Sequence, residues 1–251
     1  MKILSIGNSF SVNAHRGLYP LAVENGVDLH LGNLFIGGCS LATHWKNYTN
    51  NADAYRYYVN GEKEWIPMSI NEALAMDTWD VVTLQQASRF SGVPQSYIPY
   101  LTDLADVVRA AQPQAKLYFH QTWAYEVDFN TRYELDWFKG YNNDQAEMFR
   151  RIKDASEMAS KLIGAEMFPV GTVIQTIRQE MPEFDYPNGG MSLTSDKLHL
   201  SSTYGEFAAG ATWLYKLFGQ PIPVEGTAKR DMDAALLERI VEVVKRTVDG
   251  E

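Results

Sequence analysis

The chain of 251 residues is 45% hydrophobic and 21% charged, a balance that excludes a disordered chain and suits one globular α/β domain. Its formal net charge is -9 and no run of Lys and Arg is present, so nucleic acid is not an expected partner. Cys39 is the single cysteine, which excludes an internal disulfide and a zinc site built from cysteines.

The first ten residues, MKILSIGNSF, carry an apolar run that stops at Gly7-Asn8, too early for a signal peptide. No later stretch is apolar for long enough to span a bilayer, so a membrane is not an expected partner either. We therefore expect a cytoplasmic protein, with export on a removed signal left open. The sequence predicts no oligomeric state.

In chain order, the first apolar run predicts a buried strand that ends at Gly7. A helix is expected over residues 14–24, with Asn13 as its N-cap and Gly26 as its stop. A second strand is expected over residues 27–36. Three further short apolar runs predict strands around residues 81–84, 117–119 and 167–170.

Long helices are expected between these strands and after them. Apolar side chains recur at helical spacing in three stretches, residues 98–111, 149–163 and 237–248. Alternating strands and helices favour a parallel sheet with helices on both faces, within one domain over residues 1–251.

Residues 42–66 break this alternation because they are rich in aromatic side chains. Asn60-Gly61 lies between the segments YRYYV and EKEWI and is a strong signal for a hairpin turn. We interpret the segment as a hairpin insertion beside the sheet. The aromatic residues in it are Trp45, Tyr48, Tyr55, Tyr57, Tyr58 and Trp65.

The segment Gly7-Asn8-Ser9-Phe10-Ser11 directly follows the first predicted strand. Ligands of open α/β sheets bind outside the carboxyl ends of the strands, where backbone N–H groups can face an oxyanion. Ser9 is therefore a candidate nucleophile. The alternative is a serine that only caps the next helix.

The segment Asp196-Lys197-Leu198-His199 places a carboxylate three residues before an imidazole. In a tight loop, Asp196 can accept a hydrogen bond from one ring nitrogen of His199 and leave the other nitrogen as a general base. The alternatives are a histidine that caps a helix and a surface ion pair.

Together, GNSFS near the start and DxxHLS near the end resemble the first and last blocks of the SGNH (GDSL-type) hydrolase superfamily. The resemblance implies Ser9 as nucleophile, His199 as base and Asp196 as its partner. Asn8 stands where that superfamily usually has Asp. The segments GGCSL, LQ and QTWAY are similar to those of an uncharacterised bacterial branch whose first block also reads GNSFS.

The same resemblance implies an oxyanion hole built from backbone and side-chain donors. Ser9 and Gly38 would give N–H groups, with Gly37 as the alternative glycine. The superfamily's third block usually holds an Asn, which is missing here. A Gln amide can replace it, as in the carbohydrate esterase branch that includes sialate esterases, so we expect Gln85 in this role and keep Gln86 as the alternative.

The resemblance further implies a flavodoxin-like three-layer α/β/α sandwich, a parallel five-stranded sheet of order 2-1-3-4-5, and ester hydrolysis without a metal or organic cofactor. The expected function is a carbohydrate O-acetylesterase that forms an acyl-enzyme. Trp45 and Trp123 are candidate rings for binding a sugar, although packing alone also explains them. The alternatives are a lipolytic esterase or thioesterase with the same triad, and an inactive member that binds glycans.

Overall fold

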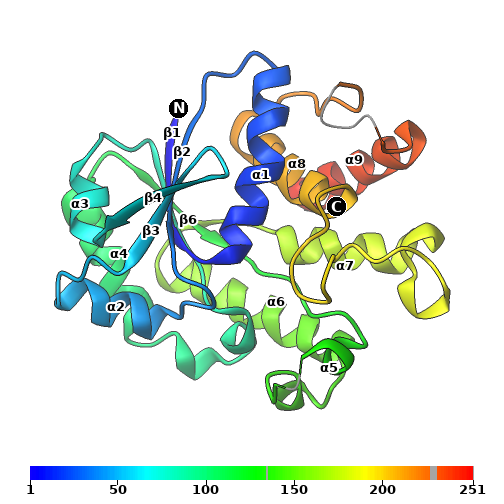
Figure 1. Cartoon of the computed structure of the whole chain (residues 1–251), viewed down its shortest axis with the longest axis horizontal. Coiled ribbons are helices and arrows are strands. Elements are labelled where there is room, and N and C mark those ends of the chain that lie inside the picture. Colours follow the sequence, from blue (N-terminus) through cyan, green and yellow to red (C-terminus); the bar gives the residue numbers. More distant parts are fainter. Residues whose placement is uncertain (134, 227–230, 251) are drawn as a thin grey trace.

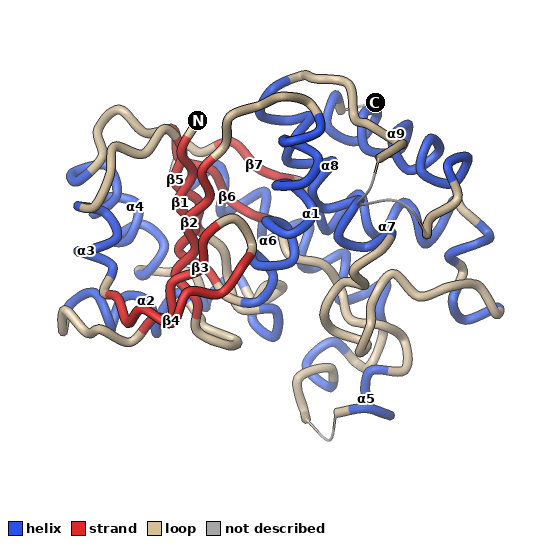
Figure 2. The backbone as a smooth tube through the Cα atoms, turned by 45° about the horizontal axis from the view of Figure 1, so that its top comes forward, coloured by secondary structure: helices blue, strands red, loops and turns tan. Residues whose placement is uncertain are grey.

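The computed structural model describes residues 1–133, 135–226 and 231–250, with the side chain of Trp65 left out. One seven-stranded sheet crosses the molecule (Figures 1 and 2). One face is covered by α2 (Leu41–Thr49), α3 (Ile70–Ala75) and α4 (Tyr100–Ala111), and the other by α1 (Ser9–Glu24), α8 (Tyr204–Phe218) and α9 (Ala234–Asp249). From one edge to the other, the strands are β4 (Glu62–Met68), β3 (Tyr55–Val59), β2 (His30–Phe35), β1 (Lys2–Gly7), β5 (Val81–Leu84), β6 (Lys116–His120) and β7 (Glu166–Phe168). In the described part of the chain, no helix is long and apolar enough to cross a membrane.

Five strands of the sheet run parallel, and β1 lies between β2 and β5. Their side chains are largely buried, as expected for strands covered on both faces. The parallel strands are β1 (Lys2–Gly7), β2 (His30–Phe35), β5 (Val81–Leu84), β6 (Lys116–His120) and β7 (Glu166–Phe168).

The predicted hairpin exists, but it extends the sheet instead of lying beside it. β3 (Tyr55–Val59) pairs antiparallel with both β2 and β4 (Glu62–Met68). The expectation of a five-stranded, all-parallel sheet is therefore wrong, because the open N–H and C=O groups along the edge of β2 recruit the hairpin as a sixth and seventh strand. The turn uses Asn60 and Gly61 at φ angles of 53° and 83°.

Nine α-helices lie in the described part of the chain. Those expected at residues 98–111, 149–163 and 237–248 correspond to α4, α6 and α9. The helices are α1 (Ser9–Glu24), α2 (Leu41–Thr49), α3 (Ile70–Ala75), α4 (Tyr100–Ala111), α5 (Phe129–Arg132), α6 (Gln145–Leu162), α7 (Val170–Glu180), α8 (Tyr204–Phe218) and α9 (Ala234–Asp249).

The first helix begins at Ser9, five residues earlier than the sequence predicts. Asn8 is its N-cap: the backbone is extended there, and its side-chain oxygen accepts a hydrogen bond from the N–H of Phe10 at 3.0 Å. Asn13, the expected cap, is buried inside the helix and binds Glu206 and Leu200. Ser9 consequently sits in the first turn of α1, at the carboxyl end of β1.

α1 and α8 pack closely against each other (Figure 1). Two glycines make this approach possible. A Cβ on Gly17 would lie 1.8 Å from the carbonyl oxygen of Glu206, and a Cβ on Gly210 would lie 2.1 Å from the carbonyl carbon of Gly17. The contact fixes the segment before α8 relative to Ser9.

Candidate active site

Ser9, His199 and Asp196 form a continuous chain of hydrogen bonds. Nε2 of His199 lies 2.9 Å from Oγ of Ser9, and Nδ1 of His199 lies 2.7 Å from Oδ2 of Asp196. The histidine and aspartate side chains are 32% and 23% exposed, so water and small molecules reach the imidazole. The structure thus brings together the three residues that the two motifs single out, although 190 positions separate Ser9 from His199.

Three further hydrogen bonds hold the carboxylate of Asp196 in place. Its Oδ1 accepts the backbone N–H groups of Leu198 and His199, and its Oδ2 also accepts the hydroxyl of Tyr133 at 2.9 Å. Partial burial raises the pKa of Asp196, but the hydrogen bonds from His199 and Tyr133 outweigh burial and bring the pKa below its ordinary value. An ionised Asp196 is suited to orient the imidazole.

The loop that carries Asp196 and His199 is a tight turn supported from the segment after β6. The N–H of Ser195 donates to the carbonyl of His199 at 2.9 Å and closes the turn. The indole of Trp123 donates to the carbonyl of Leu198 at 2.8 Å, and the N–H of Glu126 donates to the carbonyl of Lys197 at 3.0 Å.

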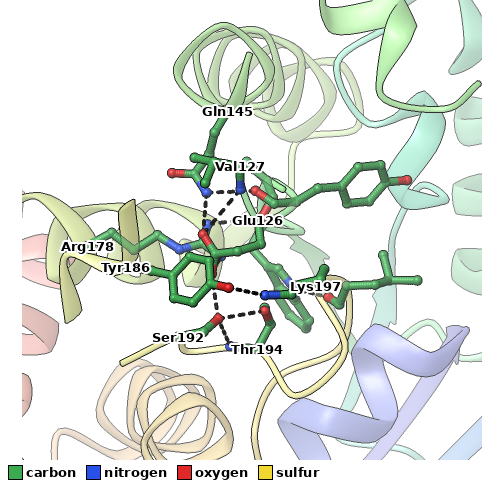
Figure 3. A network of polar contacts seen from close by, with 12 residues as sticks. Glu126, Val127, Gln145, Arg178, Tyr186, Ser192, Thr194 and Lys197 are labelled. Atoms are coloured by element: carbon green, nitrogen blue, oxygen red, sulfur yellow. Dashed lines mark hydrogen bonds and ion pairs between the residues drawn. The ribbon is translucent and has the colours of Figure 1, made fainter. Parts of the chain in front are cut away.

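A buried polar network stands behind this turn (Figure 3). The carboxylate of Glu126 accepts hydrogen bonds from Ser192 at 2.6 Å and Gln145 at 2.9 Å, and pairs with Arg178 at 3.4 Å. Burial raises the pKa of Glu126, but Arg178 and these hydrogen bonds lower it below its usual range. The network connects α6 and α7 to the strand-like segment that leads into Asp196.

Two backbone N–H groups near Ser9 are available to an oxyanion. In the residues that the structure describes, neither the N–H of Ser9 nor that of Gly38 has a hydrogen-bond acceptor. Gly38 takes a φ of 61°, a conformation that favours glycine. The amide of Asn8 donates to the carbonyl of Cys39 at 3.2 Å and thereby ties the turn of Gly38 to the start of α1.

The two glutamines after β5 have different surroundings. Nε2 of Gln85 donates to Oδ1 of Asn8 at 2.6 Å, and Gln85 lines neither of the two pockets that Ser9 lines. Gln86 accepts the N–H groups of Leu41 and Ala87 and donates to Ser96, so it holds three segments together. An oxyanion role for Gln85 stays a prediction, and its side chain here supports Asn8.

The two tryptophans expected to bind a sugar lie elsewhere. Trp123 is fully buried and stacks on Phe10 with ring centroids 4.0 Å apart, so no ligand can reach its face. Trp45 stacks with Tyr48 and lines a groove among α2, α3 and α4, away from Ser9. Neither ring is in the site because each fills a core or a helix surface.

Cys39 is buried, and burial raises the pKa of its thiol to about 12, so it is no rival to Ser9. Among the described residues, no group of three or more His, Cys, Asp and Glu side chains has the arrangement of a metal site.

Two pockets meet at Ser9 and His199, and the sequence alone predicts few of the residues that line them. One has a volume of about 300 Å³ and is lined mainly by apolar side chains; the other, of about 360 Å³, is lined mainly by polar ones. The run of aromatic and apolar residues between β6 and α6 was the signal for the first pocket. It supplies Tyr133, Leu135 and Trp137.

Comparison with known proteins identifies the family of this chain. A model of DUF4886, a domain of unknown function, matches residues 2–235. A solved DUF4886 family protein from Bacteroides uniformis ATCC 8492 is 33% identical to this chain with a TM-score of 0.87, and the match covers 99% of this chain and 94% of that one. No curated protein matches the chain significantly.

More distant structures share the fold. The lipase/acylhydrolase from Enterococcus faecalis is 10% identical with a TM-score of 0.55, over 90% of this chain and 99% of that one. A putative GDSL-like lipase from Parabacteroides merdae ATCC 43184 is 10% identical with a TM-score of 0.51, over 85% and 93%. The α/β architecture with a mixed, mostly parallel sheet therefore resembles that of SGNH hydrolases, and identities this low say nothing more about activity.

Proposed function

We propose that this chain, which belongs to the DUF4886 family, is a serine hydrolase of carboxylic esters. One observation carries the proposal: the unbroken path from Oγ of Ser9 through His199 to Asp196, with distances of 2.9 Å and 2.7 Å. A serine is a weak nucleophile alone and becomes effective when a base accepts its proton. A helix-capping role would not require this path, because Asn8 already caps α1.

In the proposed reaction, Oγ of Ser9 attacks the ester carbonyl while Nε2 of His199 takes the hydroxyl proton. The imidazolium then gives this proton to the leaving alcohol oxygen, which departs and leaves an acyl-enzyme on Ser9. Water, activated by the same imidazole, releases the carboxylic acid and restores Ser9. Asp196 stays ionised throughout and stabilises the imidazolium.

The oxyanion of each tetrahedral intermediate would be held by the N–H groups of Ser9 and Gly38. Both are unpartnered in the described structure, and Ser9 lies at the positive end of the α1 dipole. Donors that are fixed before the reaction stabilise the developing charge without reorganisation. The bond from Asn8 to Cys39 supports this arrangement because it holds the two turns together.

The expectation from the sequence is a carbohydrate O-acetylesterase, with Trp45 and Trp123 as the rings that bind the sugar. Neither ring lines the pockets at Ser9, so a carbohydrate substrate has to be argued from other residues. The polar pocket beside Ser9 supports a polar alcohol such as a sugar. A lipolytic esterase or a thioesterase would use the same three residues on an ester with a different leaving group. A protein that only binds glycans would have an unreactive Ser9. Both alternatives are separable by experiment.

A fluorophosphonate probe tests the proposal directly. We expect it to label Ser9 in the wild-type protein, as located by mass spectrometry of peptides, because only an activated serine attacks phosphorus. Ser9→Ala should abolish labelling and lower hydrolysis of p-nitrophenyl esters by several orders of magnitude with an unchanged circular dichroism spectrum. Ser160→Ala, on α6, is the matched control and should be labelled like wild type. An unlabelled wild-type protein without esterase activity would refute the proposal.

A further inference from the structure

The two pockets at Ser9 differ in chemistry, and their contrast specifies a class of substrate. The apolar pocket is lined by Phe35, Tyr133, Leu135, Trp137 and Leu198. The polar pocket is lined by Asn13, Arg16, Ser202 and Glu206, and it is followed by a second hollow of about 660 Å³ that shares Arg16 and Glu206 with it. We call these two hollows together the polar trough.

We propose that the apolar pocket binds an acyl group larger than acetyl and that the polar trough binds a neutral, polyhydroxylated alcohol such as a glycan. The substrate class is then an acylated glycan whose acyl group extends beyond two carbons. This inference rests on the proposed function, because it assigns the two halves of the ester that Ser9 would attack.

The acyl half follows from volume and lining. A cavity of about 300 Å³ is far larger than the methyl group of an acetyl ester needs. Ser9, Gly38 and His199 all line this pocket, so a carbonyl that faces Ser9 and Gly38 has room for its hydrocarbon substituent there. Each methylene removed from water gains roughly fourfold in binding, the equivalent of about 0.8 kcal/mol. An acetyl ester would leave this gain unused.

The alcohol half follows from the hydrogen-bonding groups of the trough. Glu206 is 9% exposed, accepts a hydrogen bond from Asn13 at 2.7 Å, and has a second oxygen for which the described structure offers no donor. The Nε of Arg16 donates to the carbonyl of Gly61 at 3.2 Å, which ties the guanidinium to the hairpin turn, and Arg16 lines both hollows of the trough. A carboxylate acceptor beside guanidinium donors matches the vicinal hydroxyls of a sugar.

Charge decides between neutral and anionic alcohols. Among the described residues that line the second hollow, Arg16 is the only Lys or Arg, and Glu62, Glu64 and Glu206 line the hollow with it. Phosphate groups would therefore be repelled, and the formal net charge of -9 adds to the repulsion. Acyl-CoA and phospholipids are disfavoured as substrates, while an uncharged polyol meets no such barrier.

The acyl half is tested with p-nitrophenyl acetate, butyrate and hexanoate. We expect kcat/KM to rise more than tenfold from acetate to butyrate. Gly37→Leu should reverse this preference: Gly37 lines the pocket, its φ is unstrained, and a Cβ there would meet only Phe35 at 4.0 Å. Gly37→Ala fills less of the pocket and should shift the butyrate-to-acetate ratio less. A wild-type preference for acetate would overturn this half.

The alcohol half is tested with methyl 6-O-butyryl-glucoside and butyryl-CoA, each compared with p-nitrophenyl butyrate. We expect kcat/KM for the glucoside to exceed that for butyryl-CoA at least tenfold. Glu206→Gln should lower the ratio of glucoside to p-nitrophenyl hydrolysis about tenfold, because an amide replaces a charged acceptor. Glu157→Gln, exposed on α6, should keep the wild-type ratio. A preference for butyryl-CoA would overturn this half.

These outcomes separate the inference from the proposed function. Absence of fluorophosphonate labelling and of all p-nitrophenyl ester turnover would refute the esterase itself. Labelling and turnover with a preference for acetyl or for CoA esters would refute only the substrate class.

Discussion

Asn8 is the residue on which several parts of the site converge. Its side-chain oxygen accepts hydrogen bonds from the N–H of Phe10 and from Gln85, and its amide donates to the carbonyl of Cys39. It therefore caps the helix of Ser9 and also fixes the turn of Gly38. Gln85 contacts the site through Asn8, and its side chain lines neither of the two pockets at Ser9.

This arrangement predicts unequal effects for the two glutamines. Removal of a direct oxyanion donor would lower kcat about a hundredfold or more. We expect Gln85→Ala to lower kcat by less than about tenfold, since the Gln85 amide donates to Asn8 and lines neither pocket at Ser9. Steady-state kinetics on p-nitrophenyl butyrate checks this, and a hundredfold loss at unchanged stability would show that Gln85 is a direct donor.

Gln86→Ala is the companion variant. It leaves the N–H groups of Leu41 and Ala87 and the carbonyl of Ser96 without their partner. Each such buried group costs about 1–3 kcal/mol, so the main loss should be in the free energy of unfolding measured in urea.

Glu206 makes stability depend on pH. Burial raises the pKa of Glu206 above its ordinary value of 4.5, and the hydrogen bond from Asn13 and the charge of Arg16 only partly offset burial. The folded state then holds the proton more tightly than the unfolded state, so stability gained by protonation is present below pH 4.5 and is lost as pH rises through the folded-state pKa. Gln at this position has no carboxyl group to deprotonate, so Glu206→Gln does not lose stability in this way as the pH rises.

We therefore expect Glu206→Gln to have a higher Tm than wild type at pH 7. The difference should shrink as the pH is lowered toward 4.5. Differential scanning calorimetry over this range is the measurement, and equal Tm values at pH 7 would contradict the expected sign.

At the scale of elements, the contact between α1 and α8 sets the geometry of the site. α1 carries Ser9, and α8 carries Glu206 and directly follows the loop of His199. Because Gly17 and Gly210 lie in the contact, the helices approach more closely than side chains would permit. The distance between nucleophile and base thus depends on two residues that touch neither.

Gly17→Ala should push the two helices apart. Its Cβ would lie 1.8 Å from a backbone oxygen, so the overpacking should cost about 1–3 kcal/mol of unfolding free energy and also lower kcat. Gly140→Ala is the control: its Cβ meets nothing within 4 Å, and its stability should stay within about 0.5 kcal/mol of wild type. Urea denaturation and kinetics of both variants give the comparison.

At the scale of the whole molecule, the Glu126–Arg178 pair connects segments that lie far apart in the sequence. Arg178 also donates to the carbonyl of Ala124 at 3.0 Å, so α7 supports the segment after β6, which in turn supports the loop of His199 (Figure 3). Breaking a buried ion pair of this kind lowers the free energy of unfolding strongly, because the remaining charge is left without a partner and without water around it.

Glu126→Ala should cost about 3–5 kcal/mol of unfolding free energy, since Arg178 would be left charged and buried. Loss of the bond to Ser192 should also loosen the turn of Asp196 and lower kcat more than it changes KM. Arg150→Gln removes exposed ion pairs with Glu147 and Asp154 and should leave the free energy of unfolding close to that of wild type. Similar costs for both variants in urea would argue against a supporting role for Glu126.

Much of this molecule could be predicted from sequence because the signals are local. Apolar periodicity locates the parallel strands and the long helices, and GNSFS with DxxH selects the residues that meet at the strand ends. The edge pairing of β3 with β2, the direction of the Gln85 side chain and the burial of Trp123 depend on packing between distant segments. The hydrogen bond from Tyr133 to Asp196 also depends on such packing, and no motif or spacing in the sequence predicts it.

The separation of 190 positions between Ser9 and His199 has a consequence for synthesis of the protein. A nascent chain displays the serine early, but it lacks His199 until all seven strands have been synthesised, because β7 ends at Phe168. Even then, the imidazole reaches the serine only when α8 docks on α1. A chain that ends before His199 therefore carries a serine without its hydrogen-bond partner, and the arrangement of Ser9, His199 and Asp196 forms only in chains that extend through α8.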